Sequence, residues 1–355
     1  MLKTLQAGRA LAAISVAAFH LSLMMGLNRY GGQAVFHEYT KLGNLGVDFF
    51  FVLSGFIILF AHVDDIGKSD AWGVYVYRRF VRLFPIYWLY TGTFVLLLAL
   101  VGGTDAKMPT TLGDWITSLS LIRFTDGSPP LEVAWTLFHE LAFYAVFSIL
   151  ILNYRAGLAA FGVFMFVSVF FYHYPPATAR TPFNVYTAAY NLYFVFGMGA
   201  FWLYRRGGHG VAELILGIFL STAALVTMPL PHDLSPLLTV FGFALVLAGA
   251  TKLELSGHSY IPSFLGVIGD ASYTIYLVHV SFEGVLLKIA MKAHLHQIIG
   301  AGATYIAVLT GTIALGCLAY FAIERPLLKT LRRTNERKSV RRASIQPVPS
   351  PSTQL

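Results

Sequence analysis

Residues 45–62 read LGVDFFFVLSGFIILFAH, an apolar run with a single acidic residue, Asp48, near its start. Crossing the hydrocarbon core of a bilayer takes about 20 mostly apolar residues in a helix. The run therefore predicts a transmembrane helix, and Asp48 lies where a charge is costly.

Similar apolar runs recur along nearly the whole chain of 355 residues, which is 56% hydrophobic and only 12% charged. A soluble domain of this size needs far more charge to cover its surface. The sequence predicts an all-α integral membrane protein, one membrane domain over 1–330 built as a bundle of about ten transmembrane helices. The candidate spans are 9–27, 45–62, 83–102, 134–152, 156–172, 187–204, 211–228, 237–251, 264–287 and 298–322.

The positive charges predict the orientation of these spans. With the N-terminus inside, 18 of the 25 Lys and Arg residues fall in inner segments, as the positive-inside rule requires. Both termini are therefore predicted to be cytoplasmic, in a multi-pass protein of the cell (inner or plasma) membrane. Residues 331–355 are basic and then rich in Ser and Pro, which is typical of a disordered cytoplasmic tail near the lipid surface.

Among the ionisable residues inside the predicted spans, four stand out: His20, Asp48, Glu140 and His279. Arg9 precedes His20 by eleven residues, about three helical turns, so the two share one helix face. These residues have two interpretations. They are either a functional cluster in the outer half of the bundle, or a snorkelling Arg, a hydrogen-bonded core His and carboxylates that serve as structural partners.

A second group of charges lies on the inner side, where Arg78, Arg79 and Arg82 lead into the third span. Their spacing places them on neighbouring positions of a helix, and guanidinium groups clasp phosphates bidentately. The alternative is plain positive-inside charge in contact with lipid headgroups.

Several strings together resemble the acyltransferase-3 family of integral membrane O-acyltransferases, in order from residue 5 to about residue 330. Each string alone is weak, and their order and their places at the helix ends give the resemblance its strength. They are Arg9-x10-His20, GVDFFFVLSGF at 46–56, RRFVRLFP at 78–85 followed by Tyr87-Trp88, WTLFHELAFY at 135–144, GDASYTIYLVH at 269–279 and Glu324-Arg325-Pro326.

Two departures from the family pattern are visible. Position 136 is Thr where the family more often has Ser, which keeps the hydroxyl. No sequence after Pro326 matches the extracytoplasmic esterase-like domain of some larger relatives. We therefore expect the transfer to be completed in the membrane domain or by a partner.

The resemblance implies transfer of an acyl group, often acetyl, from cytoplasmic acyl-CoA to a hydroxyl of a carbohydrate or glycolipid acceptor. His20 is then the catalytic base or transiently carries the acyl group, because an imidazole titrates near neutral pH. A carboxylate would hold one tautomer of its ring, with Glu140 as the first candidate and Asp48 as the second. Arg9 would neutralise the thioester oxygen or bind donor phosphate.

The remaining roles concern binding. Arg78, Arg79 and Arg82 would hold the CoA phosphates at the inner mouth of the bundle. The acceptor side would be lined by Tyr273, Tyr276, His279 and Trp135. Beyond acyl-CoA, the acceptor and the lipid bilayer we expect no metal and no nucleic acid, and the sequence is silent on oligomeric state.

Rival interpretations stay open at this point. A glycan or lipid transporter or flippase would use His20, Asp48 and Glu140 as a proton relay. It does not explain the arginine cluster. A third interpretation is a non-catalytic membrane partner of a polysaccharide assembly complex. If the protein is an enzyme, the sequence does not distinguish direct transfer from a route through an acyl-histidine intermediate.

Overall fold

The computed structural model describes residues 2–101, 108–172, 181–226, 235–258 and 260–331. Within these ranges the chain is helical and contains no strand. The predicted tail over 331–355 lies outside the described residues, apart from residue 331.

Ten helices of 16 residues or more make up the described bundle. They are α1 (Lys3–Met25), α3 (Leu45–His62), α4 (Ser69–Val101), α6 (Trp135–Leu152), α7 (Tyr154–Phe170), α9 (Tyr190–Arg205), α10 (Val211–Val226), α11 (Ser235–Leu255), α12 (Ser263–Lys292) and α14 (Ala301–Ala319). Shorter helices are α2 (His37–Thr40), α5 (Leu112–Ser120), α8 (Pro182–Thr187) and α13 (Leu295–Ile298), and a π-helical turn (Tyr320–Glu324) follows α14.

The fold class predicted from the sequence is confirmed: the protein is an all-α integral membrane protein. Each predicted span overlaps one of the long helices. In the described ranges, seven helical segments are long and apolar enough to cross a membrane, and α7 and α10 are apolar but shorter. The count of about ten spans and the cytoplasmic termini stay predictions.

One helix begins far from its predicted start. The third span was expected at residue 83, whereas α4 begins at Ser69 and runs for 33 residues, with Pro85 inside it. At 1.5 Å per residue such a helix is about 50 Å long. Arg79 and Arg82 therefore lie within the helix rather than before it, and they face other helices instead of only the membrane surface.

The backbones of α1 and α12 approach each other closely near the first turns of both helices. A Cβ atom on Gly269 would lie 2.1 Å from the carbonyl oxygen of Gln6, so only glycine allows this approach of the two backbones. One turn further along both helices, Arg9 meets Ser272. The glycine thus sets the register in which α1 presents its polar residues to α12.

The connection between α4 and α6 is held by polar contacts around α5. Thr111 and Asp114 form a capping box at the start of α5, and the Thr125 hydroxyl donates to Asp114 at 2.7 Å. These bonds hold the pKa of Asp114 down, at about 2, with the Thr125 bond as the largest cause. The segment after α5 is also clamped by Arg123, which lies over the ring of Phe138 on α6.

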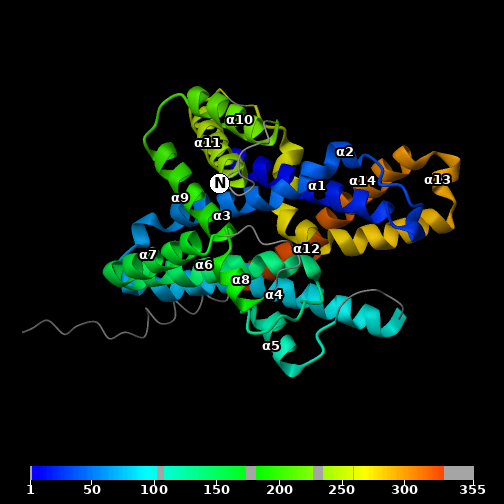
Figure 1. The fold of residues 1–355 in the computed structure, drawn as a ribbon, viewed down its shortest axis with the longest axis horizontal. Helices are drawn as coiled ribbons and strands as arrows, with labels where there is room; N and C mark the ends of the chain where they lie inside the picture. Colours follow the sequence, from blue (N-terminus) through cyan, green and yellow to red (C-terminus); the bar gives the residue numbers. More distant parts are fainter. Residues whose placement is uncertain (1, 102–107, 173–180, 227–234, 259, 332–355) are drawn as a thin grey trace, which may run out of the picture.

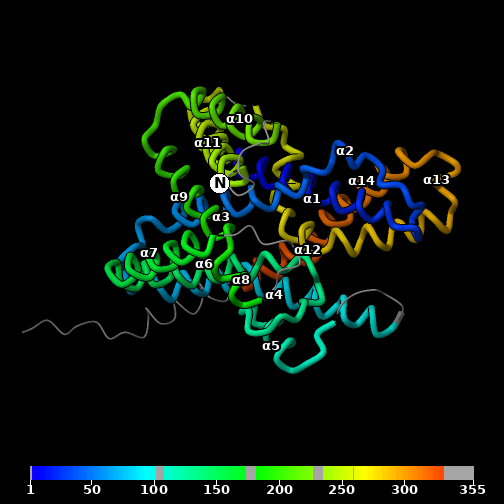
Figure 2. The backbone as a smooth tube through the Cα atoms, in the orientation of Figure 1, coloured from blue at the N-terminus to red at the C-terminus, as the bar shows by residue number. Residues whose placement is uncertain are grey.

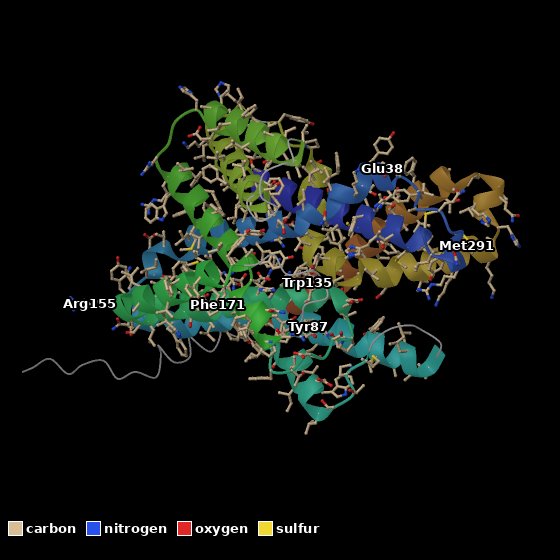
Figure 3. All side chains as sticks on the ribbon, in the orientation of Figure 1. Glu38, Tyr87, Trp135, Arg155, Phe171 and Met291 are labelled. Atoms are coloured by element: carbon tan, nitrogen blue, oxygen red, sulfur yellow. The ribbon has the colours of Figure 1, made fainter. Side chains whose placement is uncertain are left out.

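Figure 1 shows the helices staggered along the long axis, with α12, α13 and α14 reaching one end and α6 and α7 reaching the other. The tube in Figure 2 makes the course of α1 beside α12 and α14 easy to follow, and these three helices pack on one another. Figure 3 shows Arg155 near one end and Met291 near the other, with Trp135 between them where α6 begins.

Candidate active site

A cavity of about 110 Å³ opens between α1, α3, α4, α6 and α12. Apolar side chains, most of them from α3, cover part of its wall, and ten polar residues make up the rest. The polar lining residues are Arg9, Ser54, Arg79, Arg82, Thr136, Glu140, Tyr144, Ser272, Tyr273 and Tyr276. Three guanidinium groups and one carboxylate thus face one space inside a membrane bundle, where isolated charges are costly.

Arg9 enters the cavity from α1. Its Nε donates to the Ser272 hydroxyl on α12 at 2.9 Å, and Ser272 is buried. The bond uses one of the five N–H groups of the guanidinium and fixes its plane. The remaining N–H groups leave Arg9 equipped to bind an oxygen of a ligand in the cavity.

Glu140 is the carboxylate of the cavity. It accepts a hydrogen bond from the hydroxyl of Tyr144, one turn along α6, and a second from Ser54 on α3 at 3.3 Å. Both donors hold the same carboxylate oxygen, Oε1. The structure therefore places Glu140 beside the arginines, whereas the sequence layout grouped it with His20 toward the outside.

Arg82 is paired with a residue from the C-terminal end of the fold. Its Nη1 lies 3.3 Å from Oε1 of Glu324, and its guanidinium lies over the ring of Tyr273 at 5.2 Å. Glu324 is fully buried and also accepts from the Thr274 hydroxyl at 2.6 Å. Glu324 ends the π-helical turn after α14, and such turns often occur at functional sites.

Arg79 is held by a chain of polar contacts at the end of α3. Its Nη2 donates to Nε2 of His62 at 3.2 Å, and Nδ1 of His62 donates to Asp65 at 2.8 Å. The guanidinium lies 5.3 Å from the ring centroid of Tyr144, whereas its Nε has no hydrogen-bond partner among the described residues. Arg78, one residue earlier, is exposed and does not line the cavity.

The two histidines singled out in the sequence meet each other. Nε2 of His279 on α12 lies 3.2 Å from Nδ1 of His20 on α1, with ring centroids 5.0 Å apart. His279 is buried and His20 is half-buried. The pair does not line the cavity, but Tyr276, which does, stands one turn before His279 on the same helix.

Tyr276 connects the cavity wall to the start of α6. Its hydroxyl donates to the Val133 carbonyl at 3.0 Å and receives a hydrogen bond from Thr136 at 3.1 Å. The hydroxyl kept by Thr136 is therefore in use. Trp135 packs on the rings of His139 and Tyr190 outside the cavity lining.

The cavity brings together six of the eleven residues that the sequence singled out: Arg9, Arg79, Arg82, Glu140, Tyr273 and Tyr276. The other five, His20, Asp48, Arg78, Trp135 and His279, do not line it. Asp48 is buried on α3. Sequence reasoning missed roles for Glu324, His62 and Tyr144, although an ionisable residue near an apolar run was a visible signal for Glu324.

The described residues thus form an all-helical membrane bundle around a cavity lined by three arginines, with a histidine pair one helical turn from its wall. The family model of the acyltransferase domain, acyltransferase 3, matches residues 2–321. The chain belongs to this family and is a membrane O-acyltransferase. This membership decides against the transporter reading.

Three curated proteins illustrate the similarity. The exopolysaccharide production protein ExoZ of Rhizobium meliloti (strain 1021) is 34% identical over 308 residues, covering 82% of this chain and 92% of that protein. The acyltransferase MdmB of Streptomyces mycarofaciens is 28% identical over 96% of this chain and 93% of its own. Nodulation protein 10 of Rhizobium leguminosarum bv. viciae is 26% identical over 80% and 82%, respectively. No solved structure gives a significant match.

Proposed function

We propose that this enzyme transfers an acetyl group from cytoplasmic acetyl-CoA to a hydroxyl of an exported or cell-surface polysaccharide, in the cell inner or plasma membrane. The observation that carries the proposal is the cavity of Arg9, Arg79 and Arg82, which ends one helical turn from the His20–His279 pair. The printed name of the Rhizobium meliloti relative, an exopolysaccharide production protein, supports the choice of acceptor.

The donor side follows from the charges of the cavity. Arg79 and Arg82 hold phosphate oxygens of CoA, since each guanidinium offers several N–H donors in a plane. The acyl end of the donor extends toward Arg9, whose guanidinium stabilises the oxyanion that develops on the thioester carbonyl. The choice of acetyl rests on the resemblance to the family, in which the transferred acyl group is often acetyl.

His20 acts where the acceptor meets the thioester. Its imidazole takes the proton from the acceptor hydroxyl as the oxygen attacks the thioester carbon. The C–S bond then breaks, and the CoA thiolate leaves with the proton that His20 received. In a two-step variant the imidazole nitrogen attacks the thioester carbon, the C–S bond breaks and the CoA thiolate leaves. The acceptor oxygen then attacks the acyl-imidazole, the C–N bond breaks, and the hydroxyl proton passes through the released imidazole to the thiolate.

Glu140 balances the guanidinium groups when the donor is absent. Its carboxylate lies in the same cavity as three arginines and is oriented by Tyr144 and Ser54. Without it, mutual repulsion would displace the arginines from the cavity. On this basis we assign Glu140 to the donor end of the site. Asp48, which does not line the cavity, is assigned to the packing of the helices around the site.

The proposal is tested with the purified protein in lipid nanodiscs, supplied with radiolabelled acetyl-CoA and deacetylated polysaccharide from a strain that lacks the protein. We expect label in the polysaccharide and release of free CoA thiol. His20→Ala should abolish both while elution and melting temperature stay unchanged, and His258→Ala, an exposed histidine outside the cavity, should keep both.

Two outcomes would count against the proposal. Absence of CoA release with any glycan acceptor would disprove the proposed reaction. Full activity of His20→Ala would show that His20 is not the catalytic base. Label trapped on the enzyme in a single turnover, and lost in His20→Ala, would select the two-step variant. Octanoyl-CoA in place of acetyl-CoA should turn over far more slowly if the cavity limits chain length.

A further inference from the structure

The contacts of His20 and His279 determine which nitrogen of each ring carries the proton. We propose that His279 is a positioning residue that holds His20 as the Nδ1–H tautomer, so that Nε2 of His20 is the free base. This inference rests on the proposed function only where it takes Nε2 of His20 to be the base that accepts the proton of the acceptor hydroxyl. It replaces the orienting carboxylate expected from the sequence with a second imidazole.

The argument begins at the buried end of the pair. Nδ1 of His279 lies 2.8 Å from the carbonyl oxygen of Tyr276. A carbonyl oxygen only accepts hydrogen bonds, so Nδ1 of His279 carries the hydrogen. In a neutral imidazole the other nitrogen, Nε2, then has a lone pair and accepts.

The second step crosses from α12 to α1. Nε2 of His279 lies 3.2 Å from Nδ1 of His20, and as an acceptor it requires a hydrogen on that Nδ1. The carbonyl oxygen of Val16 lies 2.9 Å from the same Nδ1 and makes the same demand. Two acceptors in different helices thus require one tautomer of His20.

The opposite proton arrangement conflicts with these contacts. If His279 were doubly protonated, its Nε2–H would point at a lone pair on Nδ1 of His20, and that lone pair would also face the Val16 carbonyl. A buried imidazolium on α12 would in addition need an anion, and the contacts made by His279 are to a carbonyl and to another imidazole.

The register of the two helices makes the arrangement rigid. The close approach at Gly269 and the bond from Arg9 to Ser272 fix how α1 lies against α12 before the histidines meet. The carbonyl that orients His279 belongs to Tyr276, which itself is bonded to Thr136 and Val133. The same stretch of α12 therefore lines the donor cavity and determines the tautomer of His20.

The direct test reads the tautomer without reference to activity. Protein labelled with ¹⁵N-histidine in lipid bilayers gives solid-state NMR signals in which protonated and unprotonated ring nitrogens are separated, and the signals lost in His20→Ala belong to His20. We expect a protonated Nδ1 and an unprotonated Nε2 in the wild type. His279→Leu leaves the Val16 carbonyl as the acceptor for Nδ1 of His20, so it should reduce the share of the Nδ1–H tautomer without removing it. His139→Leu, a change at a buried histidine on α6, should leave the His20 signals unchanged.

The kinetic test uses a conservative partner of the same variant. His279→Leu removes the acceptor and should lower kcat by about 10–100-fold with little change in KM for acetyl-CoA, the range known for residues that orient metal-bound histidines. His279→Gln returns a carboxamide that donates at one end and accepts at the other, so it should restore most of the lost kcat.

Each result speaks to one claim. An Nε2–H tautomer of wild-type His20, wild-type kcat in folded His279→Leu, or His279→Gln as impaired as His279→Leu would each overturn the positioning role. Full activity of His20→Ala would instead overturn the proposed function, while the tautomer measured by NMR would stand. The expected spectra together with rescue by His279→Gln would support both.

Discussion

Nη1 of Arg82 on α4 lies 3.3 Å from the carboxylate of Glu324, which stands 242 positions later in the chain. The pair joins the first half of the bundle to its last helix. Because the same guanidinium lines the cavity and lies over the ring of Tyr273, the turn that follows α14 helps to set the shape of the cavity.

Glu324→Ala should destabilise the protein and weaken donor binding. The change leaves Arg82 without its carboxylate and removes the acceptor of Thr274. Because the side chain of Arg82 is 26% exposed, we expect a loss of roughly 1–3 kcal/mol, less than for a fully buried pair. Thermal unfolding in nanodiscs measures the loss, and KM for acetyl-CoA should rise.

The matched variant is Glu324→Gln, which keeps an acceptor for Thr274 and Arg82 but removes the charge. It should fall between the wild type and Glu324→Ala in both measurements. If Glu324→Ala unfolds at the wild-type temperature, the ion pair does not contribute to the stability of the fold.

Arg79→Ala should raise KM for acetyl-CoA at least about 10-fold, and Arg78→Ala should leave it within about two-fold, because losing one charge-assisted contact costs about 1.5–3 kcal/mol. The reason is position: Arg79 lines the cavity and Arg78 is exposed. Initial rates over a range of acetyl-CoA concentrations give both values. Equal effects of the two changes would support a surface role for the whole arginine segment.

His62→Leu should act in the same direction as Arg79→Ala, but more weakly. The imidazole accepts from Arg79 and donates to Asp65, so its loss frees the guanidinium without removing it. We expect KM for acetyl-CoA to rise about 3–10-fold, the size of one lost hydrogen bond. A double variant with Arg79→Ala should show no further increase, whereas additive effects would exclude this coupling.

Asp114→Ala should lower stability at neutral pH through the capping box of α5. Its folded pKa of about 2 lies below the unfolded value of about 3.9, so the charged form stabilises the fold. This contribution is fully present above about pH 4 and is lost as the pH falls toward about 2. Unfolding of wild type and variant at several pH values should therefore converge below about pH 4, and a gap that widens in acid would contradict the assignment.

The sequence predicted where the helices lie because long apolar runs in a membrane protein leave few alternatives to a helix. It misplaced the start of α4, since Arg78, Arg79 and Arg82 lower the hydropathy of a segment that is nevertheless helical. Charged side chains do not prevent helical hydrogen bonds, and Arg79 and Arg82 line the cavity while Arg78 is exposed.

Which site residues contact each other could not be predicted from the sequence, for a different reason. Spacing along one helix shows that Arg9 and His20 share a face, but it says nothing of which helix lies opposite. The partners of His20 and Arg82 stand 259 and 242 positions away. Only the packing of α1 on α12, and of the last helix against α4, brings them together.

The close approach at Gly269 has a consequence for how this chain can change over evolutionary time. Between the backbone contact with Gln6 and the histidine pair, one inserted or deleted residue in α1 would rotate His20 by about 100° and shift it by about 1.5 Å along the axis. His20 would then face away from His279. The length of α1 between Gln6 and His20 is therefore constrained by the contacts at its two ends.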